Sequence, residues 1–472
     1  MNLTRLMSAC GKAFIVSLVL TPIVRDVFRS YNVVDRPGIR KVHNYPIPRV
    51  GGVPIALAYL VGLISLRGNG SPFPTHWLQT ILSGALVIFL TGLIDDFVSL
   101  RPVVKLLGQI VAAGVAFASG IRIDSVAGID LPVWIALPLT IFWLLLTTNA
   151  LNMIDGLDGL CAGIGFWGAL ASAAAAAATG NPMLVYTALP LAGALLGFLF
   201  FNFNPATVFL GDSGALLVGF LLGCFGIVWA DHQLTPIAAA FPLFALCVPL
   251  LDLATSVVRR SLKRRPLFAA DRGHMHHRLL DRRLTVRGAA LKLYAAQITG
   301  AVFGLLLMWL SLRNNNGKNA FFMGLVGIAA VVAVIAGFRY LRYAEFEVAG
   351  QLLFRGAFYS LITQKLRMKK LAESLEGSRT EDEWWGFLAA AAREENWIRL
   401  EWSTAGGDVR DEILAERRSS WTFAVDLGGG ESIQLRGDSR TAPGSSDLVG
   451  LSALLSRSLH ERRRLWEQTA LS

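Results

Sequence analysis

Long apolar runs, separated by short polar segments, fill the first three quarters of the chain. About eleven of these runs are long enough, or nearly so, to cross the ~30 Å hydrocarbon core of a bilayer as helices. The pattern therefore predicts an all-α polytopic integral membrane protein with about 11 transmembrane helices. The predicted spans are residues 9–24, 51–66, 78–94, 103–120, 131–148, 160–179, 183–201, 208–230, 233–251, 291–312 and 320–338.

The first apolar run is expected to be a membrane helix. It has no small-residue cleavage site followed by a polar mature chain, which a removed signal peptide would need. It therefore counts as the first of the predicted spans.

Positive charge is concentrated in the loops that follow odd-numbered spans. Residues 25–50 contain six lysines and arginines, and residues 252–290 contain ten, whereas the loops after even-numbered spans contain few. Because cytoplasmic loops of membrane proteins carry an excess of Lys and Arg, this asymmetry predicts an orientation. We expect an inner (plasma) membrane protein whose N-terminus is outside and whose odd-numbered loops and C-terminus are cytoplasmic.

The pattern changes after Tyr343. Residues 344–472 are charged, and Gly-rich or Ser-rich turns separate the short alternating runs NWIRLEWS, WTFAVDL and ESIQLRG. Helical patterns flank these runs at about residues 351–376 and 447–469. The sequence therefore predicts a membrane domain over residues 1–343 and a small C-terminal cytosolic α+β domain over residues 344–472, to which no chemistry can be assigned.

Composition agrees with a membrane protein. The 472 residues are 54% hydrophobic and 16% charged, whereas a soluble chain would be about 45–50% apolar and about 25% charged. The net charge of +11 suits loops at an anionic lipid surface. No basic helix or aromatic-rich basic patch stands apart from the spans, which disfavours nucleic acid as a partner. The four cysteines lie in apolar stretches without metal-ligand spacing, and we interpret them as small buried hydrophobic residues.

The conspicuous carboxylates of the membrane part all lie in the odd-numbered loops, at the predicted cytoplasmic face. Acids at membrane depth cost about 3 kcal/mol and indicate function by default. Loop solvation or helix capping would explain one such cluster better than it explains several on one face. The segments are TGLIDDFVSL, NALNMIDGLDGL, FNFNPATVFLGDSG, PLLDLATSVVRR and DRGHMHHRLLDRR.

Clustered carboxylate and amide oxygens are the ligands that Mg²⁺ shares with a substrate phosphate. If residues 152–158 are helical, then Asn152, Asp155 and Asp158 lie within an arc of about 120°, because each three-residue step drifts by only ~60°. One face of the turn would then offer a metal ligand, a base or anchor, and a hydrogen-bond acceptor. We expect Mg²⁺, with Mn²⁺ as the alternative.

The segment DRGHMHHRLLDRR supplies positive charge that could bind an anion. Its arginines and histidines could hold a diphosphate. Two alternatives remain open: a zinc site made by the His-x-His-His pattern, and a basic loop that binds anionic lipid. Zinc is disfavoured because no cysteine lies near and the acids elsewhere are oxygen ligands. The residues are Arg272, His274, His276, His277 and Arg278.

Taken together and in this order, the motifs of residues 33–290 resemble a known family. It is the polyprenyl-phosphate N-acetylhexosamine-1-phosphate transferases (glycosyltransferase family 4), which include bacterial WecA, TagO and MraY and the eukaryotic dolichyl-phosphate enzyme. RPGIRKVHNYPIPRVGGVPI is similar to the first cytoplasmic loop, DDFVSLRPVVKLLGQ to the DD…K segment, NALNMIDGLDGL to NxxNxxDGxDGL, and VFLGDSG to FxGDxG. DRGHMHHRLLDR is similar to the histidine loop in the HxHH form of the WecA and TagO branch, not in the PxHHHxE form of the MraY branch.

The resemblance implies a reaction at the boundary between bilayer and cytoplasm. The phosphate of undecaprenyl phosphate would attack the β-phosphorus of UDP-GlcNAc, giving undecaprenyl-diphospho-GlcNAc and UMP, the first membrane step of cell-surface polysaccharide synthesis. The implied partners are these two substrates and the lipid bilayer, and a homodimer stays open. The sugar rests on the HxHH form alone, so another UDP-N-acetylhexosamine donor is the first alternative.

The resemblance also implies roles for the acids and the lysine. Asn152 and Asp212 would hold Mg²⁺, and Lys105 would bind phosphate. Asp95 and Asp96 would orient the acceptor phosphate, with Asp95 as the favoured base. Strong base catalysis is not expected, because a phosphate monoester has a second pKa of about 6 and is already mostly dianionic.

The remaining implied roles concern the nucleotide and the sugar. Asp158 and Phe209 match positions that bind uracil, by hydrogen bond and by stacking. Asp155 lies in the site without an assigned role. The rival function class is a transporter or lipid flippase, which would need charges along a path across the bilayer. Here the acids gather at one face. The side chains implied to hold phosphates or sugar are those of Arg272, His274, His276, His277 and Arg278.

Overall fold

The computed structural model of the chain separates into two compact units, Met1–Tyr343 and Ala344–Ser472. The structure describes residues 3–31, 34, 46–67, 74–126, 129–231, 233, 235–262, 273–313, 319–341, 368–394, 397–404, 406–413, 421–437 and 445–470.

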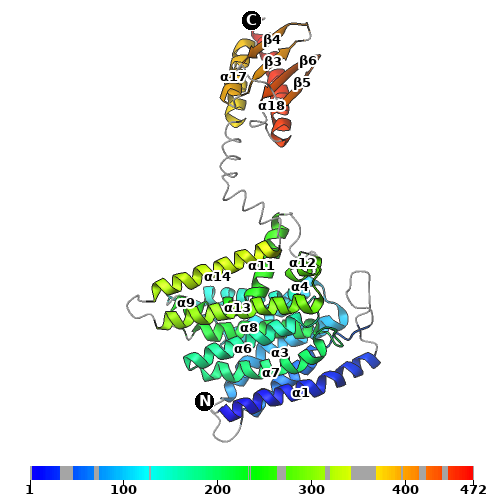
Figure 1. Cartoon of the computed structure of the whole chain (residues 1–472), viewed down its shortest axis with the longest axis vertical. Helices are drawn as coiled ribbons and strands as arrows, with labels where there is room; N and C mark the ends of the chain where they lie inside the picture. Colours follow the sequence, from blue (N-terminus) through cyan, green and yellow to red (C-terminus); the bar gives the residue numbers. More distant parts are fainter. Residues whose placement is uncertain are drawn as a thin grey trace. The chain divides into compact units, whose positions relative to one another are not determined.

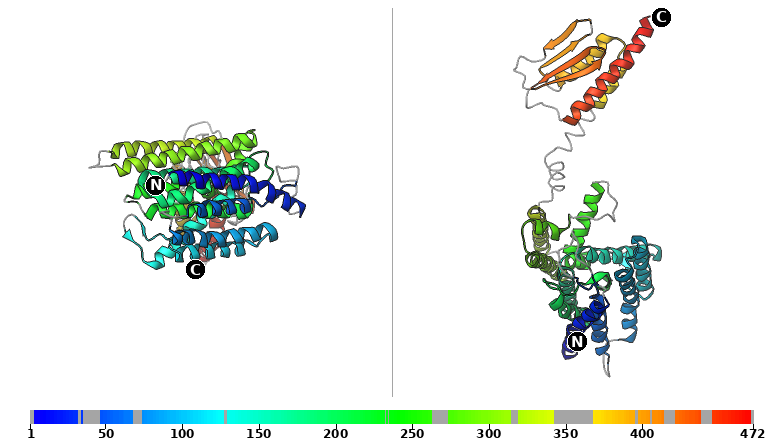
Figure 2. Two further views of the ribbon diagram at one scale, coloured as in Figure 1. Left: turned by 90° about the horizontal axis from the view of Figure 1, so that it is seen from below. Right: turned by 90° about the vertical axis from the view of Figure 1, so that its right-hand side faces the viewer.

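The first unit is a bundle of helices that run side by side (Figure 1). The central helix α8 is almost entirely buried, whereas α14 lies at the edge of the bundle in each view (Figure 2). The helices are α1 (Leu3–Ser30), α2 (Gly52–Ser65), α3 (Thr75–Val98), α4 (Pro102–Ala118), α5 (Val133–Ile154), α6 (Leu160–Thr179), α7 (Pro182–Asn202), α8 (Gly211–Asp231), α9 (Pro236–Ala239), α10 (Phe241–Ala245), α11 (Cys247–Leu262), α12 (Met275–Asp281), α13 (Val286–Leu312) and α14 (Ala320–Leu341), with a short hairpin of β1 (Ser125–Val126) and β2 (Ile129–Asp130).

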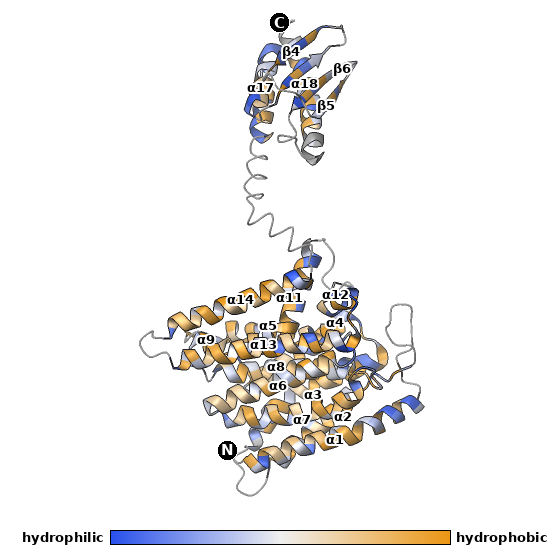
Figure 3. Ribbon diagram, viewed as in Figure 1, coloured by the Kyte–Doolittle hydropathy of each residue, from blue (hydrophilic) through white to orange (hydrophobic). Residues whose placement is uncertain are grey.

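The bundle is that of a multi-pass membrane protein. Among the described residues, 8 helices are long and apolar enough to cross a membrane, and a bent pair would make 9. Every predicted span contains a helix, but the predicted count of eleven spans is not confirmed. With 14 and 17 residues, α2 and α4 extend only about 21 and 26 Å, which is less than the hydrocarbon thickness of ~30 Å. Apolar residues predominate along the long helices, whereas hydrophilic residues gather at helix ends such as the C-terminal end of α1 (Figure 3).

The predicted single span over residues 233–251 is broken in the structure. It consists of α9, α10 and the start of α11, and the chain bends by 79° between the two halves. Prolines at positions 236, 242 and 249 cause the interruption, because proline lacks the backbone N–H and clashes with the preceding turn. The bend frees α11 to continue as a separate helix of 16 residues.

Close backbone approach determines how the central helices pack. A Cβ atom at Gly92 of α3 would lie 2.6 Å from the backbone oxygen of Asp212 in α8. A Cβ atom at Gly193 of α7 would lie 2.4 Å from the backbone oxygen of Cys10 in α1. Small residues at such contacts are typical of membrane helices, which associate through packing rather than through the hydrophobic effect. The end of α3 is thereby held directly against the beginning of α8.

The second unit contains a four-stranded antiparallel sheet with the strand order β4-β3-β6-β5. Alternate residues of the sheet, including Leu400, Trp402 and Leu435, lie in one apolar core with Trp384 of α17 and Leu455 of α18. Both helices therefore pack on the same face of the sheet. The elements are α17 (Glu381–Glu394), β3 (Arg399–Ser403), β4 (Val409–Ile413), β5 (Trp421–Gly428), β6 (Glu431–Gly437) and α18 (Ser445–Ala470), and residues 368–377 are also helical.

Candidate active site

The turn between α3 and α4 brings Asp95 and Lys105 together. Ser99 ends α3 in the left-handed conformation, with φ 52, and its backbone N–H donates to the Asp95 carbonyl oxygen over 2.9 Å. The Asp95 carboxylate accepts a hydrogen bond of 2.7 Å from the backbone N–H of Leu100. The same carboxylate lies 2.9 Å from the Lys105 Nζ atom. The tight turn thus fixes a buried carboxylate directly beside an ammonium group.

Asp96, the next residue, binds the beginning of α8. Its carboxylate accepts hydrogen bonds from the backbone N–H groups of Asp212 (2.7 Å) and Ser213 (3.0 Å) and from the Ser213 hydroxyl (2.6 Å). Gly211 has φ +74, and a Cβ atom there would lie 2.8 Å from the Asp96 carboxylate. A carboxylate suits a helix N-terminus because its N–H groups are otherwise unpaired. Asp96 thus positions Asp212, and its predicted contact with an acceptor phosphate stays a prediction.

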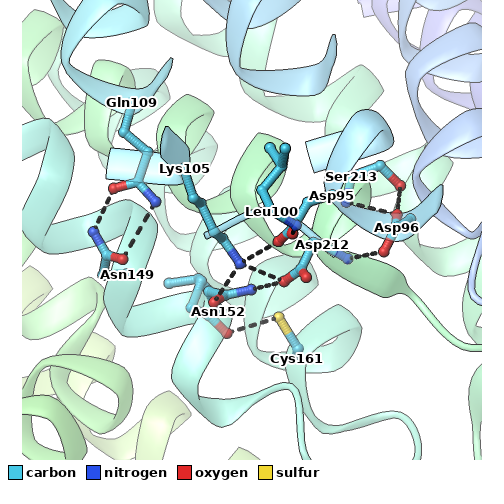
Figure 4. A network of polar contacts seen from close by, with 11 residues as sticks. Asp95, Asp96, Leu100, Lys105, Gln109, Asn149, Asn152, Cys161, Asp212 and Ser213 are labelled. Atoms are coloured by element: carbon cyan, nitrogen blue, oxygen red, sulfur yellow. Dashed lines mark hydrogen bonds and ion pairs between the residues drawn. The ribbon is translucent and has the colours of Figure 1, made fainter. Parts of the chain in front are cut away.

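Lys105 is surrounded by side-chain oxygens from three other helices (Figure 4). Its Nζ atom lies 2.9 Å from Asp95 Oδ2, 2.8 Å from Asp212 Oδ1 and 3.4 Å from Asn152 Oδ1. The Asn152 Nδ2 atom also donates to Asp212 Oδ1, over 2.5 Å. Three hard oxygen donors therefore converge on one point, and a positive charge occupies that point. We call these four side chains the Lys105 network.

A second pair of amides supports the Lys105 network from deeper in the bundle. Gln109 lies one turn after Lys105 on α4, and Asn149 lies one turn before Asn152 on α5. The two amides exchange hydrogen bonds of 2.7 and 3.3 Å (Figure 4). Gln109 is buried, so these bonds are shielded from competing water. They lock α4 against α5 at the level of the site.

The turn after α5 contains Asp155, which is partly buried. Burial raises the pKa of the Asp155 carboxyl to about 7, and the negative charges of Asp212 and Asp96 act in the same direction. The positive charges of Arg49 and Lys105 oppose this shift. A carboxyl group with such a pKa is easily protonated near neutral pH. Asp155 therefore adds less negative charge to the site than its neighbours add.

Asp158 and Phe209 belong to adjoining loops. One Asp158 carboxylate oxygen accepts hydrogen bonds from the Asn204 side chain (2.9 Å) and the Ala206 backbone N–H (3.1 Å). This ties the turn after α5 to the segment that leads to Phe209. The Phe209 N–H donates to the Pro48 carbonyl oxygen over 2.9 Å, which places the end of the first loop beside it. Their predicted role in binding uracil is compatible with this arrangement and stays a prediction.

The histidine helix α12 is held by a buried acid on α11. The Asp252 carboxylate lies 2.8 Å from His274 Nδ1 and accepts a 2.7 Å hydrogen bond from the backbone N–H of Met275. Asp252 is fully buried. A carboxylate at Nδ1 fixes both the orientation and the tautomer of an imidazole ring and leaves Nε2 for a ligand. In the sequence Asp252 is part of the segment PLLDLATSVVRR, and no pattern there predicts its contact with His274.

His276 packs against the turn after α5. Its ring is stacked on the His274 ring, with centroids 5.7 Å apart, and its centroid lies 4.3 Å from that of His277. A Cβ atom at Gly156 would lie 2.8 Å from His276 Nε2, so this contact requires glycine. Burial, with a smaller contribution from His277, lowers the pKa of His276 to about 3. Within the described part of the chain, Nε2 of this neutral ring has no hydrogen-bond partner.

The structure collects most of the predicted site residues into two groups. The Lys105 network, with Asp96, joins the ends of α3, α4, α5 and α8, and the histidines approach it at Gly156. Arg278 lies on the same helix as the histidines, and its Nε atom donates to the Gly273 carbonyl oxygen over 3.4 Å. The prediction for Arg272 lies outside the described residues.

The donor set suits magnesium better than zinc. Among the described residues, no three side chains of His, Cys, Asp or Glu are grouped so that they could hold a metal ion. The convergence of carboxylate and amide oxygens on Lys105 is instead the chemistry that Mg²⁺ prefers. The residues present therefore fit the predicted Mg²⁺ ion, with Asn152 and Asp212 as its ligands.

Comparison with known proteins indicates the family to which the chain is related. The model of the family described as glycosyl transferase family 4 matches residues 78–230, which include the whole Lys105 network. The chain is 34% identical over 313 residues to "Probable undecaprenyl-phosphate N-acetylglucosaminyl 1-phosphate transferase" of Bacillus subtilis (strain 168), covering 64% of this chain and 86% of that protein.

Two further relatives carry different names. "Decaprenyl-phosphate N-acetylglucosaminephosphotransferase" of Mycobacterium tuberculosis (strain ATCC 25618 / H37Rv) is 34% identical over 301 residues, covering 57% of this chain and 74% of that protein. "Phospho-N-acetylmuramoyl-pentapeptide-transferase" of Moorella thermoacetica (strain ATCC 39073 / JCM 9320) is 34% identical over 291 residues, covering 57% of this chain and 88% of that protein. With a family model that matches the site and a relative similar over most of its length, the chain belongs to glycosyl transferase family 4.

Proposed function

We propose that the chain transfers N-acetylglucosamine-1-phosphate from UDP-GlcNAc to undecaprenyl phosphate, giving undecaprenyl-diphospho-GlcNAc and UMP. The observation that carries the proposal is the Lys105 network, where oxygens from α3, α5 and α8 converge on a cation at the ends of membrane helices. A lipid phosphate in the bilayer and a water-soluble nucleotide can meet only at such a boundary. The name of the Bacillus relative supports the same donor and a polyprenyl acceptor.

The predicted metal fits the network without new ligands. Asn152 and Asp212 would hold Mg²⁺, with Mn²⁺ as the alternative, and the bound ion would neutralise the negative charge of the diphosphate. The ammonium of Lys105 lies at the point where the three side-chain oxygens converge. Since like charges repel at this distance, Lys105 would turn toward a phosphate when the metal is bound.

Asp95 and Lys105 are the residues best placed to orient the acceptor. The Leu100 N–H holds the Asp95 carboxylate in one position, and Lys105 is within an ion-pair distance of it. An ammonium is a flexible point charge that suits a phosphate oxygen. Because the acceptor phosphate is already mostly dianionic, alignment with the diphosphate matters more than removal of a proton.

The histidine helix α12 would bind the sugar or the phosphates of the UDP-sugar donor. His274 is anchored at Nδ1 by Asp252, so its Nε2 atom is available for an oxygen of the sugar or of a phosphate. The neutral His276 ring offers a nitrogen beside Gly156 that has no hydrogen-bond partner among the described residues. Arg278 adds a positive charge on the same helix. Uracil would lie at Asp158 and Phe209.

The sugar is the part of the proposal with the least support. The Bacillus and Moorella relatives are equally identical to this chain, yet their names imply different donors. The HxHH form of the histidine loop favours UDP-GlcNAc. Another UDP-N-acetylhexosamine is the alternative, and a transporter is disfavoured because the acids gather at one end of the bundle.

A panel of radiolabelled donors tests the proposal. The purified full chain is incubated with undecaprenyl phosphate, Mg²⁺ and UDP-GlcNAc, UDP-GalNAc or UDP-MurNAc-pentapeptide. We expect label in the extracted lipid only with UDP-GlcNAc. Transfer from another donor alone would contradict the sugar assignment, and no transfer from any donor would contradict the proposed reaction.

We also propose that the site faces the cytoplasm of the inner (plasma) membrane. The sequence segments of residues 25–50 and 252–290 are rich in arginine, and cytoplasmic loops carry such charge. Their described parts include Arg49, whose backbone pairs with Phe209, and His274 with its partner Asp252. The C-terminal unit would then also be cytoplasmic. Labelling of single introduced cysteines from either side of intact cells would decide this orientation.

A further inference from the structure

An apolar cavity lies apart from the polar network, between α14 and the helices α10, α11 and α13. Its volume is about 400 Å³, which falls within the ~300–1,000 Å³ of typical ligand pockets. Met275 and Leu279 of α12 form part of its wall. In Figure 1, α14 lies along α13, and α11 and α12 lie near one end of this pair.

One face of α14 is turned toward the cavity without filling it. The lining positions recur every three or four residues, as on one side of a helix, and three of them are the small residues Ala330, Ala333 and Gly337. No part of the apolar window of α14 is buried by other residues. Water would gain little in this space because it needs two or more polar partners. A hydrocarbon chain would restore the dispersion contacts that the walls lack.

Two positive charges lie at one end of the cavity. The Lys292 Nζ atom donates to the Tyr340 hydroxyl over 2.6 Å and lies 4.7 Å from the centre of the Tyr340 ring. The Arg282 guanidinium lies 4.3 Å from the same ring and donates to the Tyr340 carbonyl oxygen. Among the described residues, neither cation forms an ion pair with a carboxylate. Lys292 and Tyr340 both line the cavity.

The dimensions of the cavity match one leaflet of a bilayer. Its lining on α13 runs from Lys292 to Phe303, which corresponds to about 17 Å of helix. This is roughly half of the ~30 Å hydrocarbon core. An acyl chain that enters beside the cationic end would therefore extend along α13 to Phe303, near the middle of the membrane.

We propose that this cavity binds an anionic phospholipid, with one acyl chain between α13 and α14 and the headgroup phosphate at Lys292 and Arg282. The charge of the mouth selects an anionic headgroup, and the apolar walls accept the chain. The lipid would also support α12 from the side of Met275 and Leu279. The proposal does not depend on the catalytic activity of the chain.

Native mass spectrometry of the full chain, released from nanodiscs of phosphatidylglycerol mixed with phosphatidylcholine, tests the proposal. We expect the wild type to retain phosphatidylglycerol in preference to phosphatidylcholine. The double variant Lys292→Gln/Arg282→Gln is expected to lose this preference by about tenfold, because each basic residue near the membrane surface favours anionic lipid. Equal retention of both lipids by the wild type would overturn the headgroup assignment.

A matched pair of phenylalanine variants locates the lipid. Ala333→Phe fills the cavity and is expected to abolish retention of phosphatidylglycerol. Val332→Phe, on the opposite side of α14 where Val332 is 57% exposed, is expected to leave retention unchanged. Equal retention by the two variants would overturn the location. Displacement of phosphatidylglycerol by added undecaprenyl phosphate would overturn the choice of occupant, in favour of an isoprenoid chain.

Discussion

The acids of the membrane bundle and those of the C-terminal unit have different surroundings. In the bundle, the buried carboxylate of Asp95 and the partly buried carboxylate of Asp212 share a single ammonium, that of Lys105. In the C-terminal unit, Asp411 has the Arg399 guanidinium as its own partner, with Nε at 2.8 Å, on the open face of the sheet. The ion-pair distances are similar in the two units. In the bundle, however, two carboxylates share one positive charge, whereas Asp411 has a guanidinium of its own.

The difference shows that short ion pairs do not by themselves indicate a functional site. Exposed pairs such as Arg399 with Asp411 contribute little to stability, because water screens them. Two carboxylates on one ammonium leave unbalanced negative charge in a poorly solvated place, which is costly. Such an arrangement is stable only where the fold enforces it, and it favours the binding of a further cation.

Loss of a metal ligand is the strongest test of this contrast. We expect Asp212→Asn and Asn152→Ala to lower UMP release by about 10³-fold or more, as when a main electrostatic group of a site is removed. Neither change should unfold the protein, because both keep the side chain polar or small. Wild-type rates in either variant, or in wild type with excess EDTA, would contradict the metal assignment.

Removal of the Lys105 ammonium should separate its two proposed roles, which are to bind phosphate and to occupy the cation position. Lys105→Gln is expected to reduce turnover by about 10²–10³-fold, because it deletes a phosphate ligand. The same variant should bind Mn²⁺ more tightly than wild type, since the ammonium no longer competes for the three oxygens. Paramagnetic resonance of bound Mn²⁺ measures this without turnover. Unchanged or weaker Mn²⁺ binding would show that Lys105 does not occupy the cation position.

The buried acid behind the histidine helix should have a smaller effect. Asp252→Asn keeps the shape of the side chain but weakens its hold on His274, and we expect turnover to fall by about 10–100-fold, as when a group that orients a ligand is lost. Asp281→Asn, which changes an exposed acid on the same α12, is the matched control. Equal activity of the two variants would mean that the orientation of His274 does not matter.

Deletion of the C-terminal unit should have the least effect. All residues of the proposed site precede α13, and the described ion pairs of residues 368–470 each join opposite charges, as Arg463 does with the buried Glu431. We expect a chain lacking residues 350–472 to retain turnover in detergent within about twofold, since this unit contributes no ligand to the site. A folded, monodisperse truncation without activity would refute this expectation.

Sequence patterns predicted the helices and the polar network because both depend on local features. Apolar runs determine where helices lie in a membrane, and acids at their ends are too costly to be incidental. The bond between Asp252 and His274 could not be predicted, because the two residues are 22 positions apart in the sequence and no local pattern distinguishes this acid from any other. The sequence feature that could have indicated this bond is the position of Asp252, an acid at the start of a segment rich in basic residues.

Other features escaped prediction for physical reasons. Prolines at 236, 242 and 249 interrupt an apolar run, but proline also occurs inside the continuous helices α5 and α7, so the 79° bend was not evident. Strand β4 has the sequence VRDEI, whose charges hide its alternation. The cavity beside α14 arises from how helices pack, which no periodicity encodes.

Identification of the released nucleotide tests the central claim most directly. The purified full chain is given UDP-GlcNAc labelled at the β-phosphate, with undecaprenyl phosphate and Mg²⁺, and the products are separated. We predict unlabelled UMP in the aqueous phase and labelled phosphate in the lipid, because the bond that breaks joins the two phosphates of the donor. Release of labelled UDP would mean transfer of the sugar alone and would contradict the account.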